Sequence, residues 1–130
     1  KFETYTSLKT EITNHLISIT INHKEIVLFD RLLKNDIHKL TANEIQSSGY
    51  VLHTLEASIW CLLTTDNYKE AVLKAVNLGN DTDTTGAVTG GLAGLLHGLD
   101  NIPINWIKQI ARKDDIENLA ERLAEKIASQ

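Results

Sequence analysis

The stretch GNDTDTTGAVTGGLAGLLHG, residues Gly79–Gly98, joins a cluster of oxygen-bearing side chains directly to a run of small and apolar residues. Residues 80–84 each carry a side-chain oxygen. After Asp83, no aspartate, glutamate, lysine or arginine occurs before Asp100. This boundary predicts a helix that starts at the polar cluster and continues into a body that packs closely against other elements.

Glycines at four-residue spacing mark one face of this predicted helix, which covers residues 84–99. Positions four apart lie on the same face of an α-helix. An interior glycine costs roughly 1 kcal/mol relative to alanine, so repeated glycines indicate that a small side chain is required. We therefore predict close backbone approach to a neighbouring helix, expect this helix to be the most enclosed element, and assign the glycines no chemistry. The glycines are Gly86, Gly90, Gly94 and Gly98.

Helical periodicity also dominates the rest of the chain and predicts an all-α fold. We expect a single domain, residues 1–130, built as a compact bundle of orthogonal helices. Thr41 and Glu44 fit a capping box that starts a short helix, and Pro103 suits the first turn of another. The further apolar stripes predict helices over residues 8–19, 26–35, 50–63, 68–78, 103–110 and 116–127.

One segment, SITINHKEIVLF at residues 18–29, is ambiguous. Its β-branched residues would suit a strand. Two helices that meet near Asn22 and His23 are the preferred interpretation, because no partner strand is evident elsewhere in the sequence.

Composition excludes several classes of function. The chain of 130 residues is 42% hydrophobic and 23% charged, which is typical of a globular domain. Its net charge of −4 and scattered basic residues argue against nucleic-acid binding, and residues 84–99 are too short and glycine-rich for a membrane span. The single cysteine, Cys61, is expected to be an inert core thiol in a reducing, cytoplasmic compartment. A start at Lys1 and the lack of methionine predict that a longer polypeptide precedes this chain.

The aspartates of the polar cluster have two interpretations on the residues alone. Asp81 and Asp83 could cap the helix, because oxygen-bearing side chains are preferred at helix starts. The two carboxylates, at i and i+2, could instead converge on a hard cation such as Mg²⁺ or Ca²⁺, which takes oxygen ligands. One cap needs a single oxygen, whereas this cluster has five consecutive residues with side-chain oxygens. The spacing does not match an EF-hand, and the dispersed histidines are expected to be surface or packing residues.

Three segments resemble the C-terminal half of the ADP-ribosylglycohydrolases. They read SSGYVLHTLEASIW, NYKEAVLKAVNLGNDTDTTGAVTGGLAGLLHGL and IPINWI, and together they lie between residues 47 and 110. That family includes dinitrogenase-reductase-activating glycohydrolases and hydrolases of ADP-ribosyl-arginine and ADP-ribosyl-serine. The resemblance implies an all-α fold, a binuclear Mg²⁺ or Mn²⁺ centre and cleavage of an ADP-ribose glycosidic bond.

The family's Gly-x-Asp-x-Asp-Thr motif coincides with residues 79–84 of this chain. The resemblance implies that Asp83 is a candidate bridge between two metal ions. Asn80 stands where the family usually shows a second glycine, a departure that leaves the ligands in place. The implied metal ligands are Asp81, Asp83 and Thr84, and the residues expected to bind substrate are Ser48, Gly49, Tyr50 and Asn80.

The motifs of the family's N-terminal half are absent from this sequence. Those motifs supply further metal ligands and an acidic residue near the reaction centre, so the catalytic acid or base is expected outside this chain. The resemblance therefore implies half of an enzyme, completed by an N-terminal half in cis or in trans, that hydrolyses ADP-ribosylated protein or a related conjugate. The alternatives are an inactive ADP-ribose-binding or structural homologue, or a capped helical bundle with no ligand.

Overall fold

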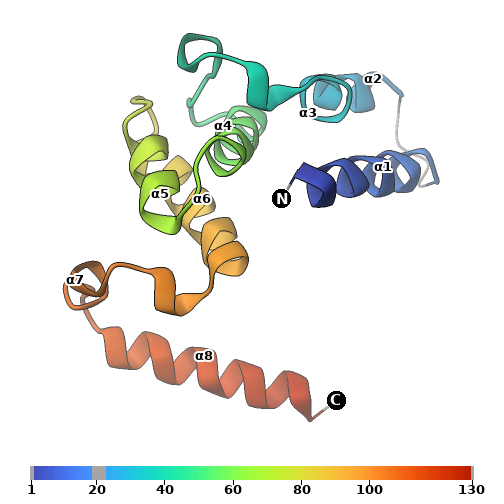
Figure 1. The fold of residues 1–130 in the computed structure, drawn as a ribbon. Coiled ribbons are helices and arrows are strands. Elements are labelled where there is room, and N and C mark those ends of the chain that lie inside the picture. The colour runs from blue at the N-terminus through green and yellow to red at the C-terminus, as the bar shows by residue number, and fades with distance from the viewer. Residues whose placement is uncertain (1, 19–22, 130) are drawn as a thin grey trace.

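The computed structural model describes residues 2–18 and 23–129, and every regular element in these two ranges is a helix (Figure 1). The all-α prediction is thus confirmed. The α-helices are α1 (Phe2–Ser18), α2 (His23–Ile26), α3 (Asp30–Leu33), α4 (Val51–Leu63), α5 (Tyr68–Val76), α6 (Thr82–His97), α7 (Ile104–Ile107) and α8 (Lys113–Ala128). The 3₁₀ helices are η1 (Val27–Phe29), η2 (Ile37–Lys39), η3 (Ala42–Glu44) and η4 (Leu99–Asn101).

Three predicted helices differ from the observed ones. The helix expected over residues 8–19 starts earlier, at Phe2, as α1. The single helix expected over residues 26–35 is divided into α2, η1 and α3. Val27 and Leu28 are more than half exposed, so a continuous helix would gain little burial at that point. The helix expected to reach residue 110 ends as α7 at Ile107. No strand forms over residues 23–29, while the predicted junction at Asn22, like Ile19, lies outside the described residues.

The centre of the molecule is α4, which packs against α5 and α6 (Figure 1). Trp60 is almost fully buried and its Nε1–H donates a hydrogen bond to the Leu40 carbonyl at 2.9 Å. Cys61 is fully buried, which confirms its core position, and burial raises the pKa of its thiol to about 11. The buried apolar cluster consists of Leu32, Ile37, Ile45, Ala57, Trp60, Cys61, Leu63 and Ala75.

The expectation that the glycine-rich helix is the most enclosed element is wrong. α6 buries only Thr85, Thr89 and Ala93, whereas α4 buries residues along most of its length. The opposite side of α6 is open, and Leu95 is 87% exposed. The glycine pattern correctly indicates one tightly packed face but carries no information about the other.

The glycine face of α6 does lie against α5. A Cβ atom at Gly86 would come within 2.9 Å of Val76 Cγ1, and one at Gly90 would come within 3.3 Å of the Tyr68 hydroxyl. Gly94 is looser, with 4.0 Å to Tyr68 Cε2. Gly98 has a different role, because its φ of +84° ends the helix in a conformation that favours glycine.

Gly86→Leu should therefore destabilise the fold, and Gly91→Leu should not. Leucine at position 86 would force Val76 aside, and overpacking of this kind costs about 1–3 kcal/mol. Gly91 is exposed with no neighbouring atom within 4 Å of its Cβ position, so leucine there should add about 0.5–1 kcal/mol through helix propensity. Urea denaturation of the two variants measures whether the free energy of unfolding falls or rises in each. Equal stabilities would contradict the packing of α5 on α6.

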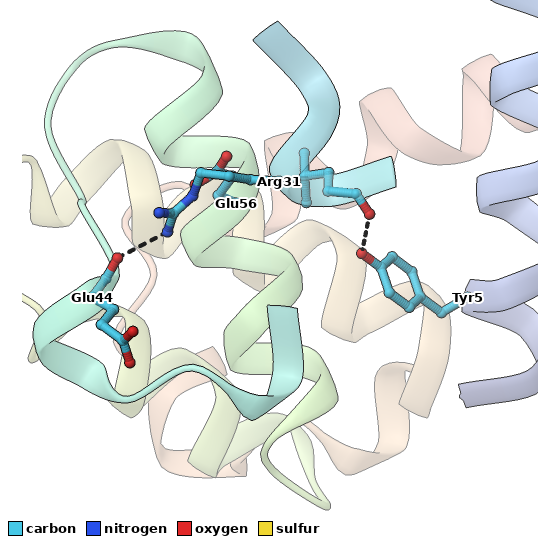
Figure 2. Close-up of polar contacts among 5 residues, drawn as sticks. Tyr5, Arg31, Glu44 and Glu56 are labelled. Carbon is cyan, nitrogen blue, oxygen red and sulfur yellow. Dashed lines mark hydrogen bonds and ion pairs between the residues drawn. The ribbon is translucent and has the colours of Figure 1, made fainter. Parts of the chain in front are cut away.

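A separate set of polar contacts links α1 to α3 and α3 to α4 (Figure 2). Arg31 on α3 donates from Nε to Glu56 Oε2 at 2.9 Å and from Nη2 to the Glu44 carbonyl at 2.9 Å. The Glu56 side chain is only 7% exposed. On α1, the Tyr5 hydroxyl donates to the Leu32 carbonyl at 2.7 Å, and burial, followed by nearby negative charge, raises the pKa of Tyr5 to about 12.

Removal of the Arg31 charge should leave Glu56 buried without its partner. Arg31→Met is expected to lower the free energy of unfolding by about 1–3 kcal/mol. Loss of a fully buried ion pair would cost more, but the Arg31 side chain is 45% exposed. The control is Lys34→Met, which removes a solvent-exposed ion pair with Asp30 and should change stability by less than about 1 kcal/mol. Urea denaturation that ranks Lys34→Met as the more damaging change would contradict this assignment.

Apolar surface remains open on one side of the molecule. A groove of about 490 Å³ lies among α1, α3, α4 and α6, and Leu8, Ile12 and Leu96 lie on its exposed rim. α8 buries none of its residues and extends away from the other helices (Figure 1). Within the described ranges, no helix combines the length and apolar character needed to cross a membrane.

Candidate metal and substrate site

The polar cluster forms the turn that leads into α6. Gly79 has a φ of +84° and Asn80 a φ of 55°, so both lie in the left-handed region. Glycine adopts this region freely, and asparagine is among the few other residues that tolerate it. This backbone requirement explains why asparagine is acceptable at a position where the resembling family shows glycine. Asn80 is exposed in this turn.

Asp81, Asp83 and Thr84 lie together at the first turn of α6. Asp81 is the N-cap residue, and its Oδ1 accepts a hydrogen bond from the Thr84 amide at 3.4 Å. Asp83 Oδ1 accepts from the same amide at 3.0 Å. The pKa of Asp81 lies below its usual value. The main cause is hydrogen bonding with the Thr84 side chain, and hydrogen bonding with Asp83 is the second. The capping interpretation is confirmed, and the two carboxylates nevertheless converge on one point.

A second segment, residues 47–50, lies directly against this turn. The Asp81 amide donates to the Ser47 carbonyl at 3.0 Å, and the Ser47 hydroxyl donates to the Gly79 carbonyl at 2.9 Å. A Cβ atom at Gly49 would lie 3.1 Å from Asp81 Oδ2, so any larger residue would crowd the carboxylate. The structure thus brings the expected substrate-binding loop and the expected metal ligands together across more than 30 residues of sequence.

The 47–50 segment is held at its other end by the first turn of α4. Ser48 Oγ and His53 Nδ1 are 2.7 Å apart, and the Tyr50 amide donates to Ser48 Oγ at 3.3 Å. The Thr54 hydroxyl donates to the Ser48 carbonyl at 3.4 Å. The ring of Tyr50, which is 47% exposed, meets the His53 ring edge-on at 5.1 Å.

Two of these residues were not predicted from the sequence. Ser47 acts through backbone atoms of the aspartate turn, and nothing in a sequence marks such a bond. His53 was expected to be a surface or packing residue. Its spacing from Ser48, across the start of a predicted helix, is the one signal that could have drawn attention to the pair.

The side chains at the start of α6 suit a hard cation. Two carboxylates and a hydroxyl form an all-oxygen donor set, which Mg²⁺ and Mn²⁺ prefer over softer metals. Mg²⁺ requires near-octahedral coordination, and three side chains fall short of it. In the part of the chain that the structure describes, no group of three or more His, Cys, Asp or Glu side chains is placed to hold a metal ion. The residues fit a partial metal site.

Comparisons with known proteins agree with this arrangement. The sequence profile of the ADP-ribosylglycohydrolase family matches residues 7–130. The chain is 49% identical over 81 residues to ADP-ribosylarginine hydrolase Tri1 of Serratia proteamaculans, a match that covers 62% of this chain and 22% of that protein. It is 39% identical over 72 residues to ADP-ribosyl-[dinitrogen reductase] glycohydrolase of Rhodospirillum rubrum, covering 55% and 24% respectively. The match therefore spans about a quarter or less of the length of these relatives.

Proposed function

The chain belongs to the ADP-ribosylglycohydrolase family, and from that premise we propose that it supplies half of the active site of an ADP-ribosyl hydrolase. The proposed reaction is hydrolysis of the glycosidic bond that joins ADP-ribose to a protein side chain or a related conjugate. Because the Serratia relative is named for ADP-ribosylarginine, an arginine conjugate is the first substrate to test.

One observation carries the proposal. The Asp81 amide donates to the Ser47 carbonyl at 3.0 Å, and this bond places residues 48–50, of which Gly49 and Tyr50 are exposed, beside the carboxylates at the start of α6. A ligand that touches both segments would meet hydroxyl and backbone groups on one side and negative charge on the other. That combination suits a sugar–phosphate conjugate only if a cation neutralises the carboxylates, because bare carboxylates would repel the phosphates.

The proposed roles follow from the donor atoms. Asp81, Asp83 and Thr84 would hold Mg²⁺ or Mn²⁺, with Asp83 as the candidate bridge between two ions in the complete site. When bound, the ions would supply Lewis-acid polarisation and lower the pKa of a bound water. The side-chain oxygens of these three residues would hold the metal. The hydrogen bonds that Asp81 and Asp83 accept from the Thr84 amide already fix the two carboxylates. The residues proposed to contact substrate are Ser48, Gly49, Tyr50 and Asn80.

The proposal includes a complementary segment that corresponds to the family's N-terminal half. It would provide the remaining metal ligands and the general acid or base that glycoside hydrolysis requires. The open apolar groove among α1, α3, α4 and α6 supports such a partner, because contiguous exposed apolar surface can mark a site of protein–protein contact. We call this chain together with its complementary segment, in cis or in trans, the complete protein.

A second candidate function is ADP-ribose binding without catalysis. It is supported by the same loop and turn, which could bind ADP-ribose without supplying a catalytic group. Release of free ADP-ribose from an ADP-ribosylarginine substrate, in the presence of Mg²⁺ or Mn²⁺, separates the two. Turnover by the complete protein supports the hydrolase, and binding without turnover supports the second candidate.

A further inference from the structure

His53 pairs with Ser48 beside the candidate carboxylates, and none of the roles above uses His53. Ser48 Oγ lies 2.7 Å from His53 Nδ1, the shortest contact within the loop. His53 belongs to the first turn of α4, whereas Ser48 belongs to the segment that precedes this helix and is half-buried. The contact therefore connects the loop to the core of the molecule.

The hydrogen-bonding capacity of Ser48 shows what this contact decides. A serine hydroxyl has one proton and two lone pairs. The Tyr50 amide occupies one lone pair at 3.3 Å. His53 Nδ1 takes either the proton or the second lone pair, according to its tautomer. A bound ligand can therefore form a hydrogen bond only with the part of the Ser48 hydroxyl, its proton or its second lone pair, that His53 does not use. The contact with His53 fixes the direction in which that part points.

A purely structural role explains the pair less well. Tyr50 is the N-cap residue of α4, and no side-chain capping bond is formed there, so the pair does not cap the start of the helix. His53 is only partly buried and lies outside the buried apolar cluster. The Thr54 hydroxyl and the Ser47 backbone already connect this segment to α4 and to the aspartate turn.

We propose that His53 is a positioning residue that orients the Ser48 hydroxyl toward an ADP-ribose conjugate bound beside Asp81. This inference rests on the proposed function. It adds a residue that touches no ligand itself and acts through Ser48. Asparagine at position 53 should replace it, because the amide offers an acceptor and a donor close to the position of Nδ1, whereas leucine offers neither.

The test is ADP-ribose binding to the complete protein with Mg²⁺, measured by calorimetry for the parent and four variants. His53→Leu and Ser48→Ala should each weaken binding about 3- to 10-fold, the range expected for one hydrogen bond. The double variant should lose no more than either single one, and His53→Asn should stay within about 2-fold of the parent. The thermal midpoint of each variant should match that of the parent.

The matched control, in addition to these four variants, is His15→Leu on α1, where an exposed histidine is replaced far along the chain from the site.

The outcomes separate this inference from the proposed function. If the parent binds ADP-ribose and the losses in His53→Leu and Ser48→Ala simply add, or His53→Leu binds as the parent does, only the positioning role is overturned. Failure of the parent to bind ADP-ribose overturns both. A ligand-free readout gives a further check: Ser48→Ala should move the Nδ1 resonance of His53 in ¹⁵N NMR and leave that of His15 unchanged.

Discussion

Asp83→Ala is expected to weaken Mn²⁺ binding by the complete protein by at least about 100-fold. Loss of a residue that merely supports a metal ligand already costs 10–100-fold in affinity, and Asp83 is proposed to bind the metal directly. Its Oδ1 accepts a hydrogen bond from the Thr84 amide at 3.0 Å, which fixes this carboxylate at the start of α6. Titration of Mn²⁺ followed by electron paramagnetic resonance gives the free and bound ion directly.

The matched control is Asp100→Ala, which removes one exposed carboxylate just beyond the opposite end of α6. It should leave Mn²⁺ affinity within about 2-fold of the parent, because exposed charges that far apart are largely screened. Equal affinity in Asp83→Ala and in the parent would refute the metal assignment.

Asp81→Asn separates the two roles of the N-cap residue. Asparagine caps a helix about as well as aspartate but carries no charge for a cation. The thermal midpoint should therefore stay close to that of the parent while Mn²⁺ affinity falls. The reverse pattern, with affinity retained and stability lost, would leave capping as the only role of Asp81.

The helices that carry the site were predictable because local signals mark them. The α4 stripe from residue 51 to 63 has a clear apolar face, and α5 begins after Asn67, whose side chain accepts from the Glu70 amide at 2.9 Å. The Thr41 capping box also forms as predicted and starts only the short helix η3. Caps and one-sided patterns depend on neighbours within a few residues, so a sequence displays them.

The predictions that were wrong concern features that depend on residues distant in the sequence. The glycines of α6 predict one close contact, and Gly86 makes it with Val76. They do not reveal that Leu95 and Leu96 on the same helix stay open, because that depends on which other segments are present. The broken helix at η1 has the same cause: an apolar run predicts burial only if a partner surface exists.

The site itself was only partly visible in the sequence. The aspartate cluster is local and was evident from its oxygen density. The position of the 47–50 segment beside it depends on backbone bonds, such as that from the Asp81 amide to the Ser47 carbonyl. Backbone groups are the same in every residue, so only the family resemblance pointed to Ser48, Gly49 and Tyr50 as neighbours of the metal ligands.

The second large effect is expected in the rate of ADP-ribose release when the chain is joined to its complementary segment. Residues 1–130 alone should release ADP-ribose from an ADP-ribosylarginine conjugate no faster than buffer containing the same metal. Three side-chain ligands hold an ion loosely, and a missing general acid or base removes a further 10²–10⁴-fold. Addition of the complementary segment should restore release by at least that factor.

Release of free ADP-ribose from an ADP-ribosylarginine conjugate therefore tests the central claim most directly, with three samples compared in the presence of Mg²⁺ or Mn²⁺. These are residues 1–130 alone, the complete protein, and the complete protein carrying Asp83→Ala. The half-site account predicts turnover only in the second sample. Full activity of residues 1–130 alone, or undiminished activity of the Asp83→Ala protein, would contradict it.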